Sequence, residues 1–507
     1  MQVDILFIHP ADHKKTYQDL SKEFSAIATP VWTSLLANYT RNKGYATVIY
    51  DVNIQGWDEN RAGEILSKYN PRLIVMMVYG HNPSASTQTM PAAGRVARDI
   101  KKYNREIPIA MGGIHPSALP EQTLQEEDID FVIQGEGPYT IEGLILYLKG
   151  RENIRNIRGL WFRDNNLISF TLPAPLVKDL DKELDGYAWD LLPDINNYRA
   201  HNMHCFQDFE RSNKDDFSDL RSPYATMNTS LGCPYSCSYC CINAVFGKPG
   251  IRYWSLDRVV SWIDTLVNKY RVRNIRFDDE LFILSSERVE KFCDLIIERG
   301  YDLNIWIYGR VDTIQERLLK KFKKAGINWV CLGIESGNQM VRDSVNKNIK
   351  KDIKDITRIL QANGIYVLGN FMFGLPEDDL NTMEETFKLA MDLNCEFINF
   401  YSAMAYPGSK LYEWFFQKKK YFPKSWDGFS QLGYETQPLS TNYVSAREVL
   451  QFRDEAFYKY YTNSVYLNMI KNKFGDKVRK HLEKMVEIKI KRRLIDNPEV
   501  ITKESLK

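Results

Sequence analysis

The sequence contains no run of about 18 continuous apolar residues, the length that a helix needs to cross a membrane. Its first residues also lack the basic start and the cleavage site of a secretory signal peptide. The 67 Lys and Arg residues are balanced by 65 Asp and Glu residues, so no overall field favours nucleic acid or an anionic membrane. We therefore expect a cytoplasmic protein with no integral membrane segment and no nucleic-acid partner.

Cysteine is scarce, with eight residues in a chain of 507. This number excludes a disulfide scaffold, which small secreted domains build at much higher density. Three of the eight, Cys233, Cys237 and Cys240, nevertheless crowd into one short segment. Such clustering indicates metal chemistry in a reducing compartment.

Residues 1–150 predict an α/β domain with a doubly wound, Rossmann-like sheet, because short apolar segments alternate there with helical stretches. A GxGxxG motif after the first strand is absent, so a dinucleotide site is not favoured. Several glycines do follow the predicted strands, at the edge where such sheets hold ligands. They are Gly80, Gly112, Gly113, Gly135 and Gly137. The alternative is that these glycines only serve tight turns.

The rest of the chain predicts three further parts. Residues 151–222 are polar and indicate a linker with a small hairpin. Residues 223–414 contain six strand segments, each followed by a helical one, which predicts a partial (β/α)6 barrel. Residues 415–507 predict a helical C-terminal domain with helices at Ser445–Met469 and Asp476–Arg493. We interpret its basic run at 489–493 as a solvated helix face.

The segment that carries chemistry lies directly after the first predicted barrel strand. There Cys233, Cys237 and Cys240 have the spacing CxxxCxxC. Three thiolates can hold three irons of a [4Fe-4S] cluster and leave the fourth iron open. A closed zinc site needs four ligands, and the sequence offers only Cys205 beside His201 and His204 as further candidates. Cys241 leaves a three-and-three spacing open as well.

CxxxCxxC after a first barrel strand, with the aromatic Tyr239 before the last cysteine, resembles the radical S-adenosylmethionine (SAM) superfamily. Five later segments resemble its cobalamin-binding group in the right order. They are Phe277-Asp278-Asp279-Glu280, Gly309-Arg310-Val311-Asp312, Gly333-Ile334-Glu335-Ser336-Gly337, Gly374-Leu375-Pro376-Glu377 and Tyr406-Pro407-Gly408. In the first domain, Gly112-Gly113-Ile114-His115-Pro116-Ser117 and Gly135-Glu136-Gly137 resemble that group's cobalamin (B12)-binding domain.

The resemblance implies two sets of binding residues beside the metal ligands Cys233, Cys237 and Cys240. For SAM they are Tyr239, Asp278, Asp279, Arg310, Glu335, Gly374 and Pro376. For cobalamin they are Gly80, Gly112, Gly113, His115, Gly135, Glu136 and Gly137. The alternative for Arg310 and Glu335 is an ion pair with each other across neighbouring strands, because buried charges must be paired.

The motif DxHxxG, which supplies a histidine to the lower face of cobalt in older cobalamin domains, is absent after the first strand. His13 follows Asp12 directly, with no glycine behind it. The resemblance therefore implies cobalamin in its base-off form, without a histidine ligand. It leaves open a domain that has lost cobalamin, and for His115 it favours a loop-shaping or nucleotide-tail contact.

The resemblance implies an enzyme of the class B radical SAM methyltransferase type. It would cleave SAM at a reduced cluster and transfer a methyl group to an unactivated carbon of a small-molecule, natural-product or lipid substrate. An electron donor such as flavodoxin or ferredoxin is implied as a partner. The alternatives are a cobalamin-dependent cyclase, rearrangement or oxidative enzyme without methyl transfer, a cobalamin-free isomerase or lyase, and an iron-sulfur sensor.

Overall fold

The computed structural model describes residues 2–80, 85–164, 167–209, 218–418 and 422–497. Its first sheet has the strand order β2-β1-β3-β4-β5-β6-β7. The strands β1 (Ile5–His9), β2 (Thr47–Asp51), β3 (Leu73–Val78), β4 (Ile109–Gly113) and β5 (Phe131–Ile133) pair in parallel. The order 2-1-3-4-5 confirms the doubly wound prediction and sets a switch point between β1 and β3.

Helices cover both faces of this sheet, since its strands are buried on both sides. Along β1, Ile5 and Phe7 join one apolar core while Leu6 and Ile8 join the other. The first core includes side chains of α3 (Val31–Asn42) and α9 (Pro138–Leu148), and the second includes those of α5 (Arg61–Tyr69) and α6 (Ala85–Tyr103).

The sheet extends past the boundary predicted at residue 150. The hairpin of β6 (Leu160–Asp164) and β7 (Leu167–Phe170) adds two antiparallel strands beside β5. The predicted hairpin is therefore part of the first sheet rather than of a linker. Its pairing covers the edge of β5, which would otherwise expose unpaired backbone groups.

The segment after the hairpin packs against the barrel instead of spanning a gap. The Tyr187 hydroxyl donates to the Asn228 carbonyl at 3.1 Å, and the Trp254 indole donates to the Leu180 carbonyl at 3.0 Å. Trp189 stacks on Tyr187 with ring centroids 5.1 Å apart. The two hydrogen bonds join residues far apart in sequence, so no local periodicity reveals them.

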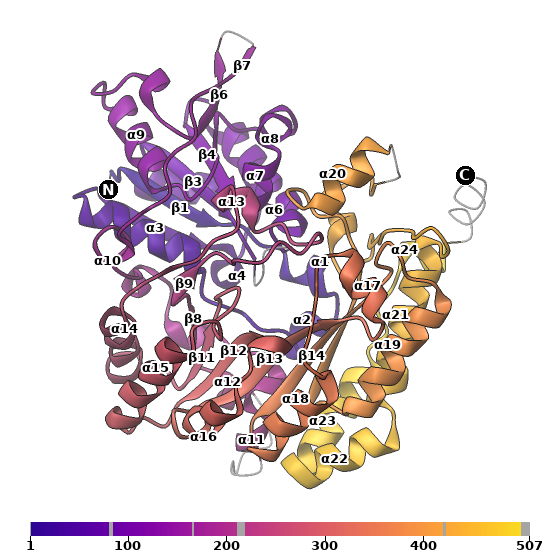
Figure 1. Cartoon of the computed structure of the whole chain (residues 1–507). Helices are drawn as coiled ribbons and strands as arrows, with labels where there is room; N and C mark the ends of the chain where they lie inside the picture. Colours follow the sequence, from indigo (N-terminus) through magenta and orange to yellow (C-terminus); the bar gives the residue numbers. More distant parts are fainter. Residues whose placement is uncertain (1, 81–84, 165–166, 210–217, 419–421, 498–507) are drawn as a thin grey trace.

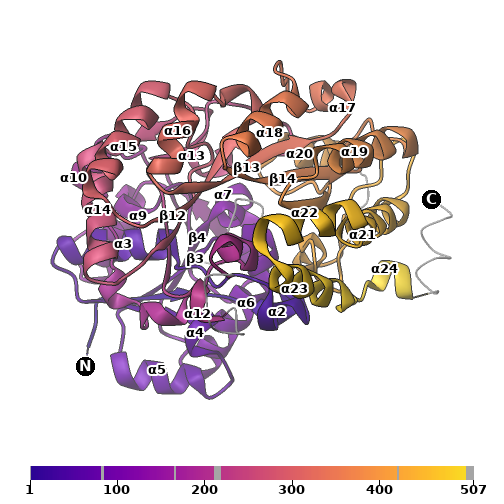
Figure 2. The same cartoon turned by 90° about the horizontal axis from the view of Figure 1, so that it is seen from below.

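The second large sheet is the predicted partial barrel, with the order β15-β14-β13-β12-β11-β8 and parallel pairing throughout. Its strands are β8 (Tyr224–Met227), β11 (Asn274–Phe277), β12 (Asn304–Arg310), β13 (Ile327–Glu335), β14 (Tyr366–Phe373) and β15 (Phe397–Ser402). The helices α14 (Leu256–Asn268), α15 (Ser286–Arg299), α16 (Glu316–Lys324), α18 (Ile353–Ala362) and α19 (Leu380–Leu393) line its outside (Figure 2). In Figure 1 the first domain lies above this barrel.

The C-terminal part is helical, as predicted, and packs beside the last barrel strands (Figure 1). The helix predicted at Ser445–Met469 is two helices, α21 (Ala446–Tyr461) and α22 (Ser464–Phe474). The chain breaks there because the Asn463 side chain caps α22.

The prediction that the basic run at 489–493 forms a solvated helix face is wrong. It connects α23 (Asp476–Glu487) to α24 (Arg493–Asp496). Arg492 is 1% exposed and donates to both carboxylate oxygens of Asp454 at 2.9 Å. Within the described ranges, no helix is both long and apolar enough to span a bilayer.

Candidate active site

A short antiparallel pair closes the cysteine-bearing loop at its base. The strands β9 (Ser230–Leu231) and β10 (Arg252–Tyr253) flank the loop, and the Gly250 amide donates to the Cys233 carbonyl at 3.0 Å. Gly232 has φ +90°, and a Cβ there would lie 2.5 Å from the Gly250 carbonyl oxygen. The loop therefore leaves β9 at a turn that only glycine fits.

Three thiols of this loop lie close enough to influence one another. Burial raises the pKa of the Cys233 and Cys240 thiols, and the nearby Cys237 raises it further in both. Cys241 is fully buried, and burial alone raises its pKa to about 12. Cys233, Cys237 and Cys240 are each partly exposed whereas Cys241 is buried, which favours Cys240 as the third ligand.

Three thiolates of one loop suit a cubane cluster, which takes one thiolate on each of three irons. Among the described residues, no three His, Cys, Asp or Glu side chains converge as ligands of one metal ion. A [4Fe-4S] cluster does not need such convergence, because each thiolate binds a different iron. Cys233, Cys237 and Cys240 are each partly exposed, so they remain accessible to a cluster.

Glu335 ends β13 in an uncommon backbone conformation, with φ +66°. Its carboxylate accepts from the Tyr239 hydroxyl at 3.0 Å and pairs with Lys347 at 3.1 Å. Both charged side chains are under a tenth exposed. Strained, buried charges at a strand end are typical of ligand sites, and this one joins the cysteine loop to the barrel.

Arg310 does not pair with Glu335, so the predicted alternative of a shared ion pair is wrong. Its guanidinium donates to both oxygens of Asp312, at 3.0 and 3.1 Å, and to the Asn348 carbonyl at 3.0 Å. It also lies over the Tyr235 ring, 4.0 Å from the centroid. Arg310 thereby fixes the chain around the cysteine loop.

The three acidic residues after β11, which are Asp278, Asp279 and Glu280, have different partners. Asp278 pairs with the buried Arg276 at 2.5 Å. Asp279 is 1% exposed and accepts from the backbone amides and hydroxyls of Thr229 and Ser230. Its oxygens are thus used to hold the strand that leads into the cysteine loop.

Glu280, next in this segment, is a residue that the sequence reasoning missed. Its carboxylate accepts from the Gly232 amide at 3.2 Å, and burial raises its pKa to about 8. Its position directly after two predicted site residues was the available signal. Lys347 was also missed, because it comes from a loop without a recognisable pattern.

Gly374 and Pro376 lie beyond β14. Gly374 has φ +82°, and its amide donates to the Asp378 carboxylate at 3.0 Å. A Cβ at Gly374 would lie 2.5 Å from a Val449 methyl carbon. Pro376 is half-buried in the following turn. The glycine therefore allows α21 to approach the strand end.

A cavity of about 350 Å³ occupies the inside of the barrel. Aromatic side chains and amides form much of its wall, including Trp306, Tyr308, Tyr401, Asn370 and Asn399. The Asn399 side-chain amide donates to the Asn370 side-chain oxygen Oδ1 at 3.1 Å, and the Asn370 side-chain nitrogen donates to the Cys331 sulfur at 3.1 Å. Tyr239, Cys240 and Glu335 also border this cavity, so the cysteine loop opens into it.

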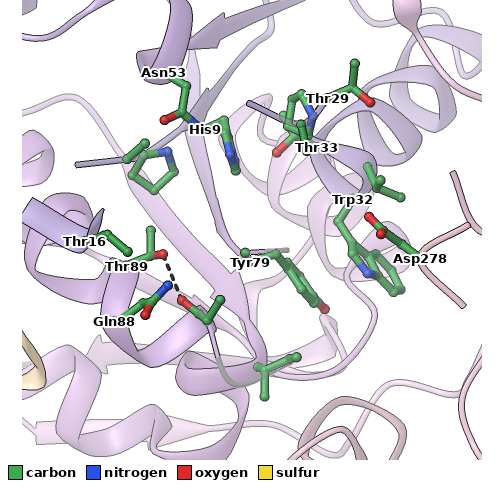
Figure 3. A pocket seen from close by; sticks show the side chains of 18 of the residues that line it. His9, Thr16, Thr29, Trp32, Thr33, Asn53, Tyr79, Gln88, Thr89 and Asp278 are labelled. Atoms are coloured by element: carbon green, nitrogen blue, oxygen red, sulfur yellow. Dashed lines mark hydrogen bonds between the residues drawn. The ribbon is translucent and has the colours of Figure 1, made fainter. Parts of the chain in front are cut away.

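A second pocket lies at the carboxyl edge of the first sheet, at the switch point between β1 and β3 (Figure 3). His9, Trp32, Tyr79 and Gln88 line it from the first domain, and Asp278 faces it from the barrel. Trp32 and Tyr79 stack with centroids 5.0 Å apart. A ligand in this pocket would contact both domains.

The residues predicted for cobalamin do not all face this pocket. A Cβ at Gly113 would meet the Val78 carbonyl oxygen at 2.3 Å, and one at Gly80 would meet the Ala85 Cβ at 2.2 Å. A Cβ at Gly112 would lie 3.2 Å from Met77, whereas Gly135 and Gly137 have more room. At Gly113 and Gly80 the surrounding chain leaves no room for a Cβ, so packing alone explains why these two positions are glycine.

Glu136 and His115 also have partners within the chain. Glu136 pairs with Arg252 at 2.5 Å and accepts from the Val177 amide at 2.6 Å. His115 is 1% exposed, its Nδ1 lies 3.2 Å from the Thr87 hydroxyl, and its ring meets Trp426 edge-on. These contacts agree with a loop-shaping role for His115.

The pocket itself carries the features that fit a corrinoid. It lies where doubly wound sheets bind their ligands. The buried Tyr79 hydroxyl and His9 Nδ1 make no hydrogen bond within the described part of the chain. Because buried polar groups are normally hydrogen-bonded, these two atoms are available to a ligand. The pocket also shares Thr16, Tyr17, Ala85 and Gln88 with the barrel cavity. Fold and site together define a radical SAM enzyme with a second ligand pocket on its N-terminal sheet.

Comparisons with known proteins agree with this class. Residues 227–390 match the radical SAM superfamily model, and residues 18–145 match the B12 binding domain model. The chain belongs to the radical SAM superfamily and carries a B12-binding domain.

The relatives cover most of the chain. An uncharacterized methyltransferase of Pyrococcus horikoshii is 27% identical over 401 residues, 78% of this chain and 80% of that protein. An anaerobic magnesium-protoporphyrin IX monomethyl ester cyclase of Rubrivivax gelatinosus is 26% identical over 474 residues, 91% and 78% of the two chains. The structure of the cobalamin-dependent SAM radical enzyme OxsB matches with a TM-score of 0.69 at 15% identity, covering 96% of this chain and 72% of OxsB. This last match supports the fold.

Proposed function

We propose that this enzyme is a cobalamin-dependent radical SAM methyltransferase acting on a small molecule. The observation that carries the proposal is the junction of the two pockets, which share Thr16, Tyr17, Ala85 and Gln88. A methyl donor at the sheet edge and a substrate in the barrel would meet there without crossing solvent. Holding reacting atoms in such a geometry contributes much of an enzyme's rate enhancement.

The chain's own residues prepare this site in three ways. Cys233, Cys237 and Cys240 would hold the [4Fe-4S] cluster, and Asp279 anchors the strand that leads to them. Glu335, with Tyr239 beside it, offers a carboxylate to the hydroxyls or ammonium of SAM. When bound, the cluster with SAM supplies an adenosyl radical and cobalamin supplies a methyl group.

The substrate proposal follows from the cavity wall. Trp306, Tyr308 and Tyr401 offer flat apolar surfaces, and Asn370 and Asn399 offer amide groups. Arg276 and Arg453 also border the cavity, but both lie beside acidic partners, Asp278 and Asp454. This wall favours a substrate with ring surfaces and neutral hydrogen-bonding groups.

The cluster must be reduced from outside, so we include an electron donor of the flavodoxin or ferredoxin type in the proposal. The absence of DxHxxG favours cobalamin with its own base displaced. The relatives include a cyclase as well as a methyltransferase, so ring closure without methyl transfer is the second candidate.

The test uses the anaerobically reconstituted enzyme with SAM that carries a deuterated methyl group. Candidate ring-containing substrates are supplied, and products are analysed by mass spectrometry. We expect a product heavier by one labelled methyl group, together with S-adenosylhomocysteine and deoxyadenosine. A product that contains no label, formed together with deoxyadenosine, would instead establish the cyclase-type alternative.

A further inference from the structure

A third cavity, of about 120 Å³, lies beside the junction of the two pockets already described. Thr16 and Gln88 line this cavity, the sheet-edge pocket and the barrel cavity alike. In Figure 3 both residues lie on the side of the sheet-edge pocket that is away from Trp32. The three cavities therefore meet at one place, and the third extends from there in a direction of its own.

The walls of the third cavity come from three parts of the chain and reach the molecular surface. One wall is α1 (His13–Tyr17), which lies between the first domain and the barrel in Figure 1. Helix α6 forms the second wall, and the C-terminal segment at 427–435 forms the third. The side chains of Lys15 and Arg95, on α1 and α6, are 51% and 43% exposed. The cavity therefore opens to solvent at this rim.

The segment at 427–435 also separates the third cavity from the barrel cavity. Ser430 lines the third cavity, whereas Gln431 and Leu432 line the barrel cavity. The Gln431 side chain is fixed on the barrel side, where it accepts from the Ser402 amide at 3.0 Å and donates to the Ser402 carbonyl at 2.9 Å. A route from the third cavity to the barrel therefore runs around this segment, through the junction.

The rim of the third cavity carries paired charges. Lys15 pairs with Asp427 at 2.6 Å, so this pair joins α1 to the C-terminal segment across the opening. Arg95 pairs with Asp12 at 3.0 Å within the first domain. Glu435 adds a further carboxylate, which is paired with an arginine of α24. The charges nearly balance, which suits the passage of a small polar molecule, because such a molecule can exchange its water for these groups.

We propose that the third cavity is the entrance through which the substrate reaches the barrel, and that the Lys15–Asp427 pair at its rim helps to decide which molecules pass. The inference rests on the proposed function, since it takes the barrel cavity as the place of the substrate. It narrows the substrate class to small polar molecules of low net charge. Lipids, which the sequence left open, are disfavoured by such a rim.

The test uses Cys331, a buried thiol that lines the barrel cavity, as a reporter of entry. The full-length protein is treated with two methanethiosulfonate reagents of similar size, one carrying a trimethylammonium group and the other a sulfonate group. The mass of the peptide that contains Cys331 gives the rate of modification by each reagent. The ratio of the two rates cancels the low reactivity that burial gives this thiol.

Lys15→Ala removes a positive charge from the rim, and Asp427→Asn removes a negative one. We expect the ratio of cationic to anionic rates to rise about threefold in Lys15→Ala and to fall about threefold in Asp427→Asn at low salt, with smaller changes at high salt. Simple loosening of the rim would raise both rates and leave their ratio unchanged. Arg155→Met, which breaks an exposed ion pair with Asp164, is the matched control and should not change the ratio.

A ratio that stays at the wild-type value in both rim variants would overturn the inference, because the reagents would then enter elsewhere. An absence of Cys331 modification in the folded protein would overturn it as well. The two variants of opposite charge keep the test decisive should one of them fold poorly. The reagents need neither cofactor nor turnover, so a failed methyl-transfer test with an intact charge response would refute the proposed function and leave the entrance in place.

Discussion

Cys240 and Cys241 are adjacent in sequence but differ in their surroundings. Cys240 is partly exposed, as Cys233 and Cys237 are, whereas Cys241 is buried. The choice between the two spacings therefore depends on which of the two adjacent thiols, Cys240 or Cys241, is exposed as Cys233 and Cys237 are. This difference cannot be read from the spacing alone.

We predict that Cys233→Ala, Cys237→Ala and Cys240→Ala each lower the iron content of anaerobically reconstituted protein from about four per chain to near zero, since a cluster needs all three thiolates. Cys241→Ala is the matched control and should retain the iron. Iron analysis and the visible absorption of the cluster measure this. Iron loss in Cys241→Ala with retention in Cys240→Ala would reverse the assignment.

Glu335 is predicted to act on SAM without holding the cluster. Glu335→Gln removes one charge-assisted hydrogen bond worth about 1.5–3 kcal/mol, which corresponds to about tenfold or more in SAM affinity. We expect the KM for SAM in deoxyadenosine formation to rise by that factor while iron content stays at the wild-type level.

Tyr239→Phe serves as the control for Glu335→Gln. It removes the hydroxyl that donates to Glu335 at 3.0 Å but leaves the carboxylate paired with Lys347. We expect a smaller rise in KM. An unchanged KM in Glu335→Gln would assign Glu335 to a structural ion pair only.

At the scale of elements, the turn at Gly135–Gly137 is tied to the cysteine loop through its base. Glu136 is 3% exposed and pairs with Arg252, which lies in β10 opposite Leu231 of β9. One buried carboxylate therefore connects the first sheet to the strand pair that closes the loop. The sequence resemblance assigned the same residue to cobalamin.

We predict that Arg252→Met destabilises the protein by about 1–3 kcal/mol, because it leaves the buried Glu136 carboxylate without its cation. Arg155→Met is the matched control, since Arg155 is 68% exposed in its pair with Asp164 and should cost under about 0.5 kcal/mol. Thermal unfolding of both variants measures this. If Glu136 instead binds cobalamin, the Glu136→Gln variant should no longer bind cobalamin, while its melting temperature should equal that of the wild type.

Most elements of both sheets could be predicted from the sequence, because their strands and helices have regular apolar patterns. The helix expected at Asp476–Arg493 is found as α23, which begins at the predicted residue and ends at Glu487. The pair β9–β10 was missed because two-residue strands show no periodicity. The ion pairs of Arg310 with Asp312 and of Glu335 with Lys347 were missed, because no local sequence pattern indicates which side chains come together outside the regular elements.

At the scale of the whole molecule, buried neutral histidines make stability depend on pH. His115, His204 and His481 are each under a tenth exposed, and burial lowers the pKa of each to about 3 from 6.5. The unfolded chain therefore binds more protons than the folded one between those values. Stability is retained above about pH 6.5 and is lost as the pH falls.

Each such histidine changes the free energy of unfolding by up to about 1.4 kcal/mol per pH unit, so the three together give about 4. We expect the melting temperature of the apoprotein to fall steeply between pH 6.5 and 5. His481→Gln should make that slope shallower, since it removes one of the histidines that bind a proton only on unfolding. A melting temperature independent of pH over this range would contradict the buried neutral state.

The most direct test of the central claim is to load the protein with iron, sulfide and hydroxocobalamin without oxygen and to count both metals per chain. The account predicts about four irons and one cobalt per chain, the cluster's three protein ligands being Cys233, Cys237 and Cys240. Four irons without cobalt would remove the methyl-transfer proposal and leave a radical SAM enzyme with a repurposed first domain. Zinc in place of iron would contradict the account at its base.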